Sequence, residues 1–308
     1  MIKVQFAARP ERWATYQAPL RAAFASAGLQ VDLRQDHPAA EVDYVIYAPN
    51  SDLQDFTPYT ACKAVLSLWA GVEKITDNTT LTQPLCRMVD PGLTAGMVEW
   101  VCGHVLRYHL NIDHSLKTQD RWDPCVPPLA QERPVTILGL GALGAACAKA
   151  LSQLGFPVTG WSRSAKDIAG IHCLQGEDGF TRALEQAQIL VLLLPDTAAT
   201  ENTLNAQTLA LLPKGARLIN PGRGPLIDDA ALLAALNSGQ IAHATLDVFR
   251  QEPLPQDHPY WAHPNVTVTP HIAAETRPQT AAQMIATNIQ RNESGAPLLN
   301  QVNRSLGY

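Results

Sequence analysis

Short apolar runs alternate along the chain with longer stretches in which apolar residues recur at helical spacing. The alternation is most regular from residue 135 onward, where helical patterns such as 142–154 and 228–236 stand between the apolar runs. The runs that predict strands in this part are residues 135–138, 158–161, 189–194, 216–220, 244–248 and 266–268. Strands that alternate with helices form a parallel sheet with helices on both faces, so we predict a doubly wound α/β domain here.

The first hundred residues follow a similar pattern and predict a second α/β domain. Apolar runs at 42–47 and 64–69 predict buried strands, and the amphipathic stretch 13–27 predicts a helix. Residues 96–110 have apolar positions at helical spacing and predict one long helix. The last helical pattern, residues 276–291, follows the final predicted strand and is expected to pack back on the first domain.

Composition agrees with two compact domains and argues against several classes of partner. The chain has 308 residues, of which 46% are apolar and 17% are charged, which is enough for two separate cores. The net charge is −5 and the 23 Lys and Arg residues are scattered, so we expect no nucleic-acid partner. The most continuous apolar run, residues 189–194, is far shorter than the roughly 20 residues that span a membrane. The N-terminus has no signal-peptide pattern, so we expect no membrane association and a cytoplasmic location.

The cysteines stand alone in the sequence and form no CxxC pair. No histidine lies at metal-ligand spacing from any of them. We interpret them as small apolar residues in a reducing compartment, and we predict no metal site.

Residues 139–144 read GLGALG and fit the GxGxxG fingerprint of dinucleotide-binding domains. The fingerprint directly follows the predicted strand 135–138 and opens the predicted helix 142–154, which is the context that it requires. Its first glycine permits a tight turn, its second lets the backbone approach a pyrophosphate, and its third allows close packing of helix and strand. The helix N-terminus offers unpaired N–H groups to the phosphates. The residues predicted to bind the cofactor here are Gly139, Gly141, Ala142, Leu143 and Gly144.

The end of the next strand indicates which dinucleotide is preferred. An NAD-binding domain usually carries an acidic residue about 20 residues beyond the fingerprint, where it binds the ribose hydroxyls. Here the predicted strand runs into Ser162, Arg163 and Ser164, with Lys166 close behind and no carboxylate. A cation between two hydroxyls suits the 2′-phosphate of NADP(H), which a carboxylate would repel. We therefore predict that NADP(H) is preferred and that NAD(H) is possible; the alternative is a solvated basic loop.

Three segments beyond the fingerprint each place a polar residue just after a predicted strand, where open α/β sheets bind their ligands. They are Arg223 in NPGRG, Glu252 in LDVFRQEPLP and His271 in TPHIAAET. Each alone has a plain structural interpretation, as a surface cation, an exposed turn acid, and a helix-cap or core histidine. Together they supply a clamp for a carboxylate, a proton donor and a carboxylate that orients this donor. Reduction of a 2-keto acid needs these groups, so we predict that all three are catalytic.

In this order and spacing, the fingerprint and the three segments resemble the D-isomer-specific 2-hydroxyacid dehydrogenase family. Within the family, the chain is most similar to short bacterial members that reduce glyoxylate and hydroxypyruvate. The resemblance covers essentially the whole chain, including LWAGVEKI at residues 68–75. It implies two Rossmann-like domains, with an NAD(P)-binding domain at 98–275 inserted into a substrate domain formed by 1–97 and 276–308. It also implies a homodimer.

The resemblance implies a role for each residue that matches a family motif. Arg223 would bind the substrate carboxylate and keto oxygen, and His271 would donate a proton in reduction and accept one in oxidation. Glu252 would hold His271 and favour its protonated form. Asp247 would meet the nicotinamide carboxamide. The chain departs from the family motif at Gly222, where the family usually has Ala or Ser.

In the first domain, the resemblance assigns the substrate carboxylate to the backbone N–H groups around Ala70, Gly71 and Val72. Trp69, beside this turn, suggests a pocket restricted to glyoxylate or hydroxypyruvate, and the alternative is a core tryptophan. Two other interpretations of the whole chain stay open. One is a family member that acts on D-lactate, phosphoglycerate or formate. The other is a non-enzymatic NAD(P)-binding regulator, which would keep the glycines but would not need the three charged residues together.

Overall fold

The computed structural model describes residues 1–304. The chain divides into two compact units. The first unit is formed by Met1–Leu93 together with the segment that starts at Glu275, and the second unit by Thr94–Ala274. Along the sequence, the second unit is therefore inserted into the first. The boundaries expected from the sequence, after residues 97 and 275, lie close to these points.

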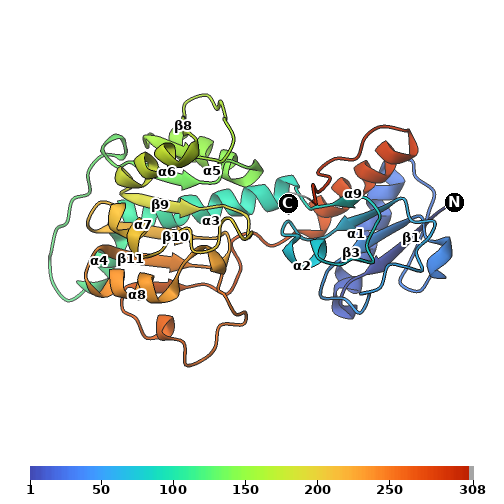
Figure 1. Cartoon of the computed structure of the whole chain (residues 1–308), viewed down its shortest axis with the longest axis horizontal. Coiled ribbons are helices and arrows are strands. Elements are labelled where there is room, and N and C mark those ends of the chain that lie inside the picture. The colour runs from blue at the N-terminus through green and yellow to red at the C-terminus, as the bar shows by residue number, and fades with distance from the viewer. Residues whose placement is uncertain (305–308) are drawn as a thin grey trace. The chain divides into compact units, whose positions relative to one another are not determined.

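The second unit is built around a seven-stranded parallel sheet with the strand order β12-β11-β10-β9-β6-β7-β8 (Figure 1). The strands are β6 (Val135–Leu138), β7 (Val158–Trp161), β8 (His172–Leu174), β9 (Ile189–Leu192), β10 (Ala216–Asn220), β11 (Ile241–Leu246) and β12 (Val266–Val268). The order runs outward from β6 in both directions, so the sheet is doubly wound as predicted. The two directions part between β6 and β9, the switch point at which such sheets bind ligands.

Four of the six predicted strands have the observed bounds, and the other two differ at their ends. Residues 193–194 lie beyond β9, where the chain passes beside the turn at Gly139. Strand β11 begins at Ile241, earlier than the predicted start at residue 244. Strand β8 was not predicted, because it is three residues long and begins with the exposed polar His172.

Helices pack on both faces of this sheet. The helices of this unit are α3 (Pro91–His109), α4 (Ile112–Lys117), α5 (Ala142–Gln153), α6 (Gly176–Glu185), α7 (Ala206–Leu211) and α8 (Asp229–Asn237), with 3₁₀ turns η2 (Ala130–Glu132), η3 (Gly224–Leu226) and η4 (Pro259–Trp261). Successive side chains of a strand point to opposite faces, so Leu190 and Leu192 join the core under α6, α7 and α8. Ile189 and Val191 join the core under α3 and α5. The predicted helices at 96–110, 142–154 and 228–236 are thus found, although α3 begins earlier, at Pro91.

The first unit holds a five-stranded parallel sheet with the order β2-β1-β3-β4-β5. Its strands are β1 (Ile2–Ala7), β2 (Val31–Arg34), β3 (Tyr44–Tyr47), β4 (Ala64–Ser67) and β5 (Leu85–Cys86), and its helices are α1 (Pro10–Ser26), η1 (Ala39–Glu41), α2 (Glu73–Thr76) and α9 (Pro278–Glu293). Both sheets are parallel and have helices packed on them, which confirms the predicted α/β fold.

One face of the smaller sheet is covered by two helices from opposite ends of the sequence. Leu20 of α1 and Ile285 of α9 share a buried core with Phe6 of β1. The expected packing of the C-terminal helix on the first domain is therefore confirmed. On the other face, Phe56 and Leu81 lie in the core, and they come from irregular chain between the strands. The alternation of strands with long helices predicted for the first hundred residues thus holds only in part.

Within residues 1–304, none of the helices combines the length and the apolar character needed to cross a membrane.

Candidate active site

The glycine fingerprint forms the turn between β6 and α5, at the switch point of the seven-stranded sheet. Gly139 has φ +105°, and a Cβ there would lie 2.4 Å from the Leu193 carbonyl oxygen. A Cβ on Gly144 would lie 1.8 Å from the Gly139 carbonyl oxygen, so a side chain there would push α5 away from the turn. A Cβ on Gly141 would meet no atom within 4 Å, so this part of the turn faces open space.

The turn and the first residues of α5 fit the phosphates of a dinucleotide. Gly141 and Ala142 are exposed and Leu143 is half-buried, so the start of α5 is open to a ligand. The first amides of a helix have no intrahelical acceptor, and the helix dipole adds a partial positive charge at this end. A phosphate could therefore approach the backbone here without displacing a side chain.

The residues after β7 differ in whether their side chains are accessible to a ligand. Arg163 and Ser164 are exposed. Ser162 is buried, and its hydroxyl donates a hydrogen bond of 2.8 Å to the Ser164 carbonyl oxygen. The Ser162 hydroxyl thus stabilises the turn itself. The predicted contact with a 2′-phosphate depends mainly on Arg163 and Ser164.

Arg223 lies in the loop after β10, and Asn220 at the end of that strand fixes the loop from inside. Asn220 is fully buried, accepts the Gly222 amide at 3.0 Å through Oδ1, and donates through Nδ2 to the Arg223 carbonyl at 2.9 Å. A Cβ on Gly222 would lie 2.8 Å from the Leu192 carbonyl oxygen, which accounts for the glycine at this position. The Arg223 guanidinium donates to the Gly222 carbonyl at 2.6 Å.

His271 and Glu252 form a hydrogen-bonded pair. Nδ1 of His271 lies 2.7 Å from Oε2 of Glu252, and Oε1 of Glu252 accepts the Phe249 amide at 2.9 Å. Burial raises the pKa of Glu252. The hydrogen bonds from His271 and Phe249 and the positive charges of His271 and Arg223 outweigh this effect and hold the pKa below its ordinary value. Glu252 is therefore ionised at neutral pH and can hold a protonated imidazole.

Asp247, directly after β11, is fully buried and supports the loop of His271. One carboxylate oxygen accepts the Thr269 hydroxyl at 2.5 Å and the Ile272 amide at 2.9 Å. The other oxygen accepts the Ala273 amide at 2.9 Å. His271 itself has φ +53°, and its amide donates to the Asp247 carbonyl at 2.9 Å. These bonds hold His271 in a conformation that few non-glycine residues adopt. The contact of Asp247 with a nicotinamide carboxamide stays a prediction.

The turn predicted to bind a carboxylate lies in the first unit, between β4 and α2. Ser67 accepts the Trp69 amide at 3.0 Å through its hydroxyl, which in turn donates to the Trp69 carbonyl at 3.1 Å. Ala70 and Gly71 follow, and α2 begins after the buried Val72. The Trp69 side chain lies at the surface of the unit, with the residue 37% exposed. Its interpretation as a core tryptophan therefore does not fit the first unit.

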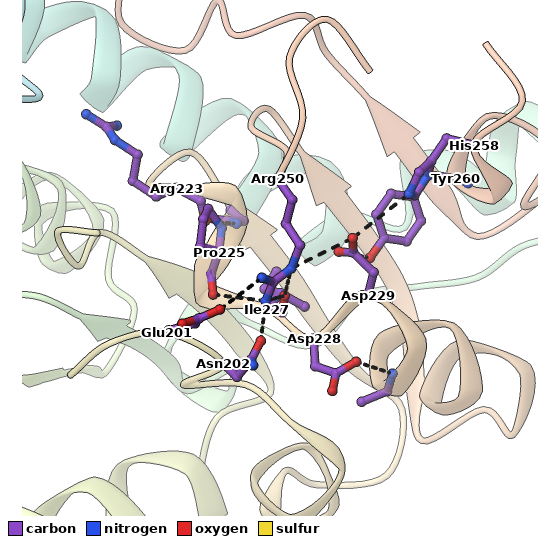
Figure 2. A network of polar contacts seen from close by, with 12 residues as sticks. Glu201, Asn202, Arg223, Pro225, Ile227, Asp228, Asp229, Arg250, His258 and Tyr260 are labelled. Carbon is purple, nitrogen blue, oxygen red and sulfur yellow. Dashed lines mark hydrogen bonds and ion pairs between the residues drawn. The ribbon is translucent and has the colours of Figure 1, made fainter. Parts of the chain in front are cut away.

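Two further residues fix these loops and had no predicted role, Asn220 and Arg250. Figure 2 shows Arg250 at the centre of a polar network that joins the loop after β11 to the segment after Arg223. A buried Asn at the end of a strand could have been suspected from the NPGRG segment. The role of Arg250 could not be predicted from a local motif, because Asn202, one of its partners, lies 48 residues away.

Known proteins are similar to this chain in sequence and in fold. The profile described as D-isomer specific 2-hydroxyacid dehydrogenase, NAD binding domain, matches residues 102–273. Glyoxylate/hydroxypyruvate reductase A of Salmonella heidelberg (strain SL476) is 41% identical to this chain over 255 residues, which are 80% of this chain and 82% of that protein.

Two solved structures match along the whole chain. A D-isomer specific 2-hydroxyacid dehydrogenase from Xanthobacter autotrophicus Py2, in complex with NADPH and MES, has a TM-score of 0.92 and 39% identity, and the match covers 100% of this chain and 99% of that one. An NADPH-dependent glyoxylate/hydroxypyruvate reductase from Sinorhizobium meliloti, in complex with NADP and sulfate, has a TM-score of 0.85 and 34% identity, with the same coverage.

These matches confirm the predicted fold and the class of cofactor, because the matched profile is that of an NAD-binding domain and both solved structures hold NADP or NADPH. The chain belongs to the D-isomer specific 2-hydroxyacid dehydrogenase family.

Proposed function

We propose that this protein reduces small 2-keto acids, glyoxylate and hydroxypyruvate, to 2-hydroxy acids with NADPH. The observation that carries the proposal is the pair of Glu252 and His271, joined at 2.7 Å on loops next to the one that bears Arg223. These loops follow the neighbouring strands β10, β11 and β12. A proton donor, its orienting carboxylate and a cation are thus held by one rigid sheet.

Arg223 is assigned the substrate carboxylate and keto oxygen. A guanidinium is planar, always charged at neutral pH, and able to bind two oxygens at once. Negative charge builds on the keto oxygen during reduction, and a positive group already in place lowers the barrier to that step. The bonds from Asn220 fix the backbone of Arg223 before substrate arrives.

His271 is assigned the proton that the keto oxygen receives. Because Nδ1 faces Glu252, Nε2 is the nitrogen assigned to this transfer. Glu252 keeps the ring oriented and compensates the charge of the protonated imidazole, as a nearby anion does. In the reverse direction, the neutral imidazole would accept the proton of the hydroxyl group.

The cofactor is assigned to the second unit, where Gly139, Gly141 and the start of α5 would hold its pyrophosphate. When bound, NADPH supplies the hydride for the keto carbon. Arg163 and Ser164 would bind the 2′-phosphate, which is the basis for preferring NADPH to NADH. The first unit would bind substrate through the turn at residues 69–72, where Trp69 would limit the size of the acid.

A steady-state screen of small and bulky 2-keto acids with NADPH and with NADH tests this function. We expect glyoxylate and hydroxypyruvate to give the highest kcat/KM, with NADPH better than NADH. Pyruvate or phenylpyruvate as the best substrate would contradict the proposed specificity. Absence of turnover with every 2-keto acid would contradict the proposed activity.

We also propose that the protein is a cytoplasmic homodimer. The end of α4 and the segment that leads from it to η2 expose several large apolar side chains: Leu116, Trp122, Val126 and Leu129. Trp122 is 96% exposed, and several exposed apolar side chains in one stretch of chain suit an interface. All six cysteines are free thiols, which suits a reducing compartment. Sedimentation equilibrium tests the dimer, and a monomer at micromolar concentration would contradict it.

A further inference from the structure

We propose that Arg250 is a positioning residue, which fixes the loop of Arg223 relative to the turn that carries Glu252. The inference rests on the proposed function, because it assigns Arg250 an effect on the reaction through these two residues. It concerns contacts within the second unit only. The hydrogen bonds of Arg250 go to backbone carbonyls and to Glu201 and Asn202, so Arg250 acts on the reaction through other residues.

The Arg250 side chain reaches from the loop after β11 to the segment that follows Arg223. Its Nε and Nη2 donate to the Ile227 carbonyl at 3.1 and 2.7 Å, and Nη2 also lies 3.3 Å from the Pro225 carbonyl. Both carbonyls belong to the stretch that follows Arg223, over η3 and the residue after it. One guanidinium thus holds the segment through which the Arg223 loop continues toward α8.

The Arg250 guanidinium also contacts a third chain segment, at Glu201 and Asn202. Nη1 lies 3.3 Å from a carboxylate oxygen of Glu201, and Nη2 donates to the side-chain oxygen of Asn202. The backbone near these residues is tied to the same segment, because the Asn202 amide donates to the Pro225 carbonyl at 2.9 Å. Arg250 therefore closes a junction of three chain segments, as Figure 2 shows.

The backbones of the two loops also touch directly. A Cβ on Gly224 would lie 2.0 Å from the carbonyl carbon of Phe249 and 2.3 Å from the amide nitrogen of Arg250. Only a residue without a side chain lets these segments approach so closely. Small movements of one loop are therefore passed to the other, and Glu252 is tied to the same turn by its bond with the Phe249 amide.

The direction of the two arginine side chains distinguishes their roles. In Figure 2 the Arg223 side chain extends away from the network, whereas the Arg250 side chain points into it. Arg250 directs its N–H groups to two carbonyls and two side chains of the protein, and its Nε also lies 3.9 Å from a carboxylate oxygen of Asp229. A guanidinium engaged in this way is suited to fix backbone geometry.

The test is the Arg250→Ala variant, compared with Arg182→Ala as a control on the exposed end of α6 in the same unit. A small misplacement of a substrate-binding group can cost about a hundredfold in rate. We expect Arg250→Ala to lower kcat/KM for glyoxylate by about ten- to a hundredfold. We expect its Kd for NADPH to stay within twofold of wild type, because the glycine turn lies elsewhere on the sheet. The control should change neither quantity.

Two measurements separate positioning from a general loss of structure. Hydrogen–deuterium exchange of the peptide over residues 222–228 should become faster in Arg250→Ala, while peptides over β6 and α5 keep wild-type protection. Arg250→Lys keeps the positive charge, but a single ammonium group cannot bind both carbonyls and Asn202 as the planar guanidinium does. We therefore expect this variant to have a kcat/KM between those of Arg250→Ala and wild type. If Arg250→Ala does not fold, Asn202→Gly removes one arm of the junction at a residue with φ +51°, which glycine adopts without strain, and should lower kcat/KM severalfold.

The proposal would be overturned by unchanged kcat/KM together with unchanged exchange at residues 222–228. Full recovery by Arg250→Lys would also overturn it, because charge alone would then suffice. A parallel loss of NADPH affinity would show general damage to the unit and would equally contradict a positioning role. If wild type reduces no 2-keto acid, the proposed function fails, and the exchange experiment still decides whether Arg250 holds the loop.

Discussion

The loops after β10, β11 and β12 in the second unit and the turn after β4 in the first unit both follow parallel strands, but they are built differently. The loops carry the charged side chains of Arg223, Glu252 and His271, and buried Asn220 and Asp247 support them. The turn is assigned its role through backbone amides, with Trp69 beside them. The chemistry assigned to the second unit thus depends on the identity of its side chains. The binding assigned to the first unit depends on the backbone conformation of the turn and on the size of Trp69.

The largest expected effect comes from removing a charged group that faces the reacting oxygen. Arg223→Ala and His271→Ala should each fold normally and lower kcat/KM by about 10²–10⁴, because each is assigned to the charge that forms in the transition state. Steady-state kinetics with NADPH and glyoxylate measures this. If either variant kept more than about a tenth of wild-type kcat/KM, a loss of less than about 1.4 kcal/mol, its assigned role would be wrong.

A smaller effect is expected at the cofactor end of the same sheet. Arg163→Ala should raise KM for NADPH about tenfold or more and leave KM for NADH nearly unchanged, because only NADPH carries the 2′-phosphate that the cation is assigned to bind. Added salt should reduce the difference, since Arg163 is exposed. Equal changes with both cofactors would contradict a phosphate contact.

Glu252→Gln should have a milder effect and a characteristic pH dependence. The lowered pKa of Glu252 means that its ionised form adds stability at neutral pH, and that this contribution is lost as the pH falls through the lowered value, below the ordinary 4.5. The side chains of His271 and Glu252 are 49% and 35% exposed. We therefore expect their pairing to add at most about 1 kcal/mol to the free energy of unfolding at pH 7. Urea unfolding at several pH values measures this. The wild type and the variant should converge in acid, and a difference that grew as the pH fell would contradict the pairing.

The smallest expected effect concerns the first unit. Trp69→Ala should change kcat/KM for glyoxylate by less than about threefold, because Arg223 and the backbone amides of the turn are assigned to hold glyoxylate, while turnover of phenylpyruvate should rise severalfold. This variant sharpens the contrast between the regions, since it alters selectivity without removing a charge. If wild type already reduced phenylpyruvate as well as glyoxylate, Trp69 would not limit the pocket.

The sequence was most informative where local chemistry and strand order act together. The glycine fingerprint required a turn and a helix at fixed positions between two strands, so β6, α5 and β7 were predicted closely although each strand has only four residues. Short elements at the edges gave weaker patterns. Strand β5 has two residues, and β8 has three, so packing with their neighbours determines these strands more than their own sequence does.

The charged residues at strand ends could be predicted, and so could the pairing of Glu252 with His271, but the contacts that depend on rotamers or on distant chain could not. Arg223, Glu252 and His271 each stand next to a recognisable segment. The bond from Ser162 to the carbonyl of Ser164 depends on a side-chain rotamer, and the junction at Arg250 depends on chain that is distant in sequence. Such contacts arise only when the fold brings these segments together.

The central claim is that hydride passes from NADPH to the keto carbon of a small acid while the protein supplies the proton. Isotope tracing tests the hydride transfer most directly. Wild-type protein is mixed with glyoxylate and with NADPH that carries deuterium at the transferable position of C4. The product is then analysed by mass spectrometry and NMR. The account predicts glycolate with one deuterium bound to carbon 2, because this carbon-bound deuterium does not exchange with water. Consumption of NADPH without deuterium in glycolate, or no consumption with any small 2-keto acid, would contradict it.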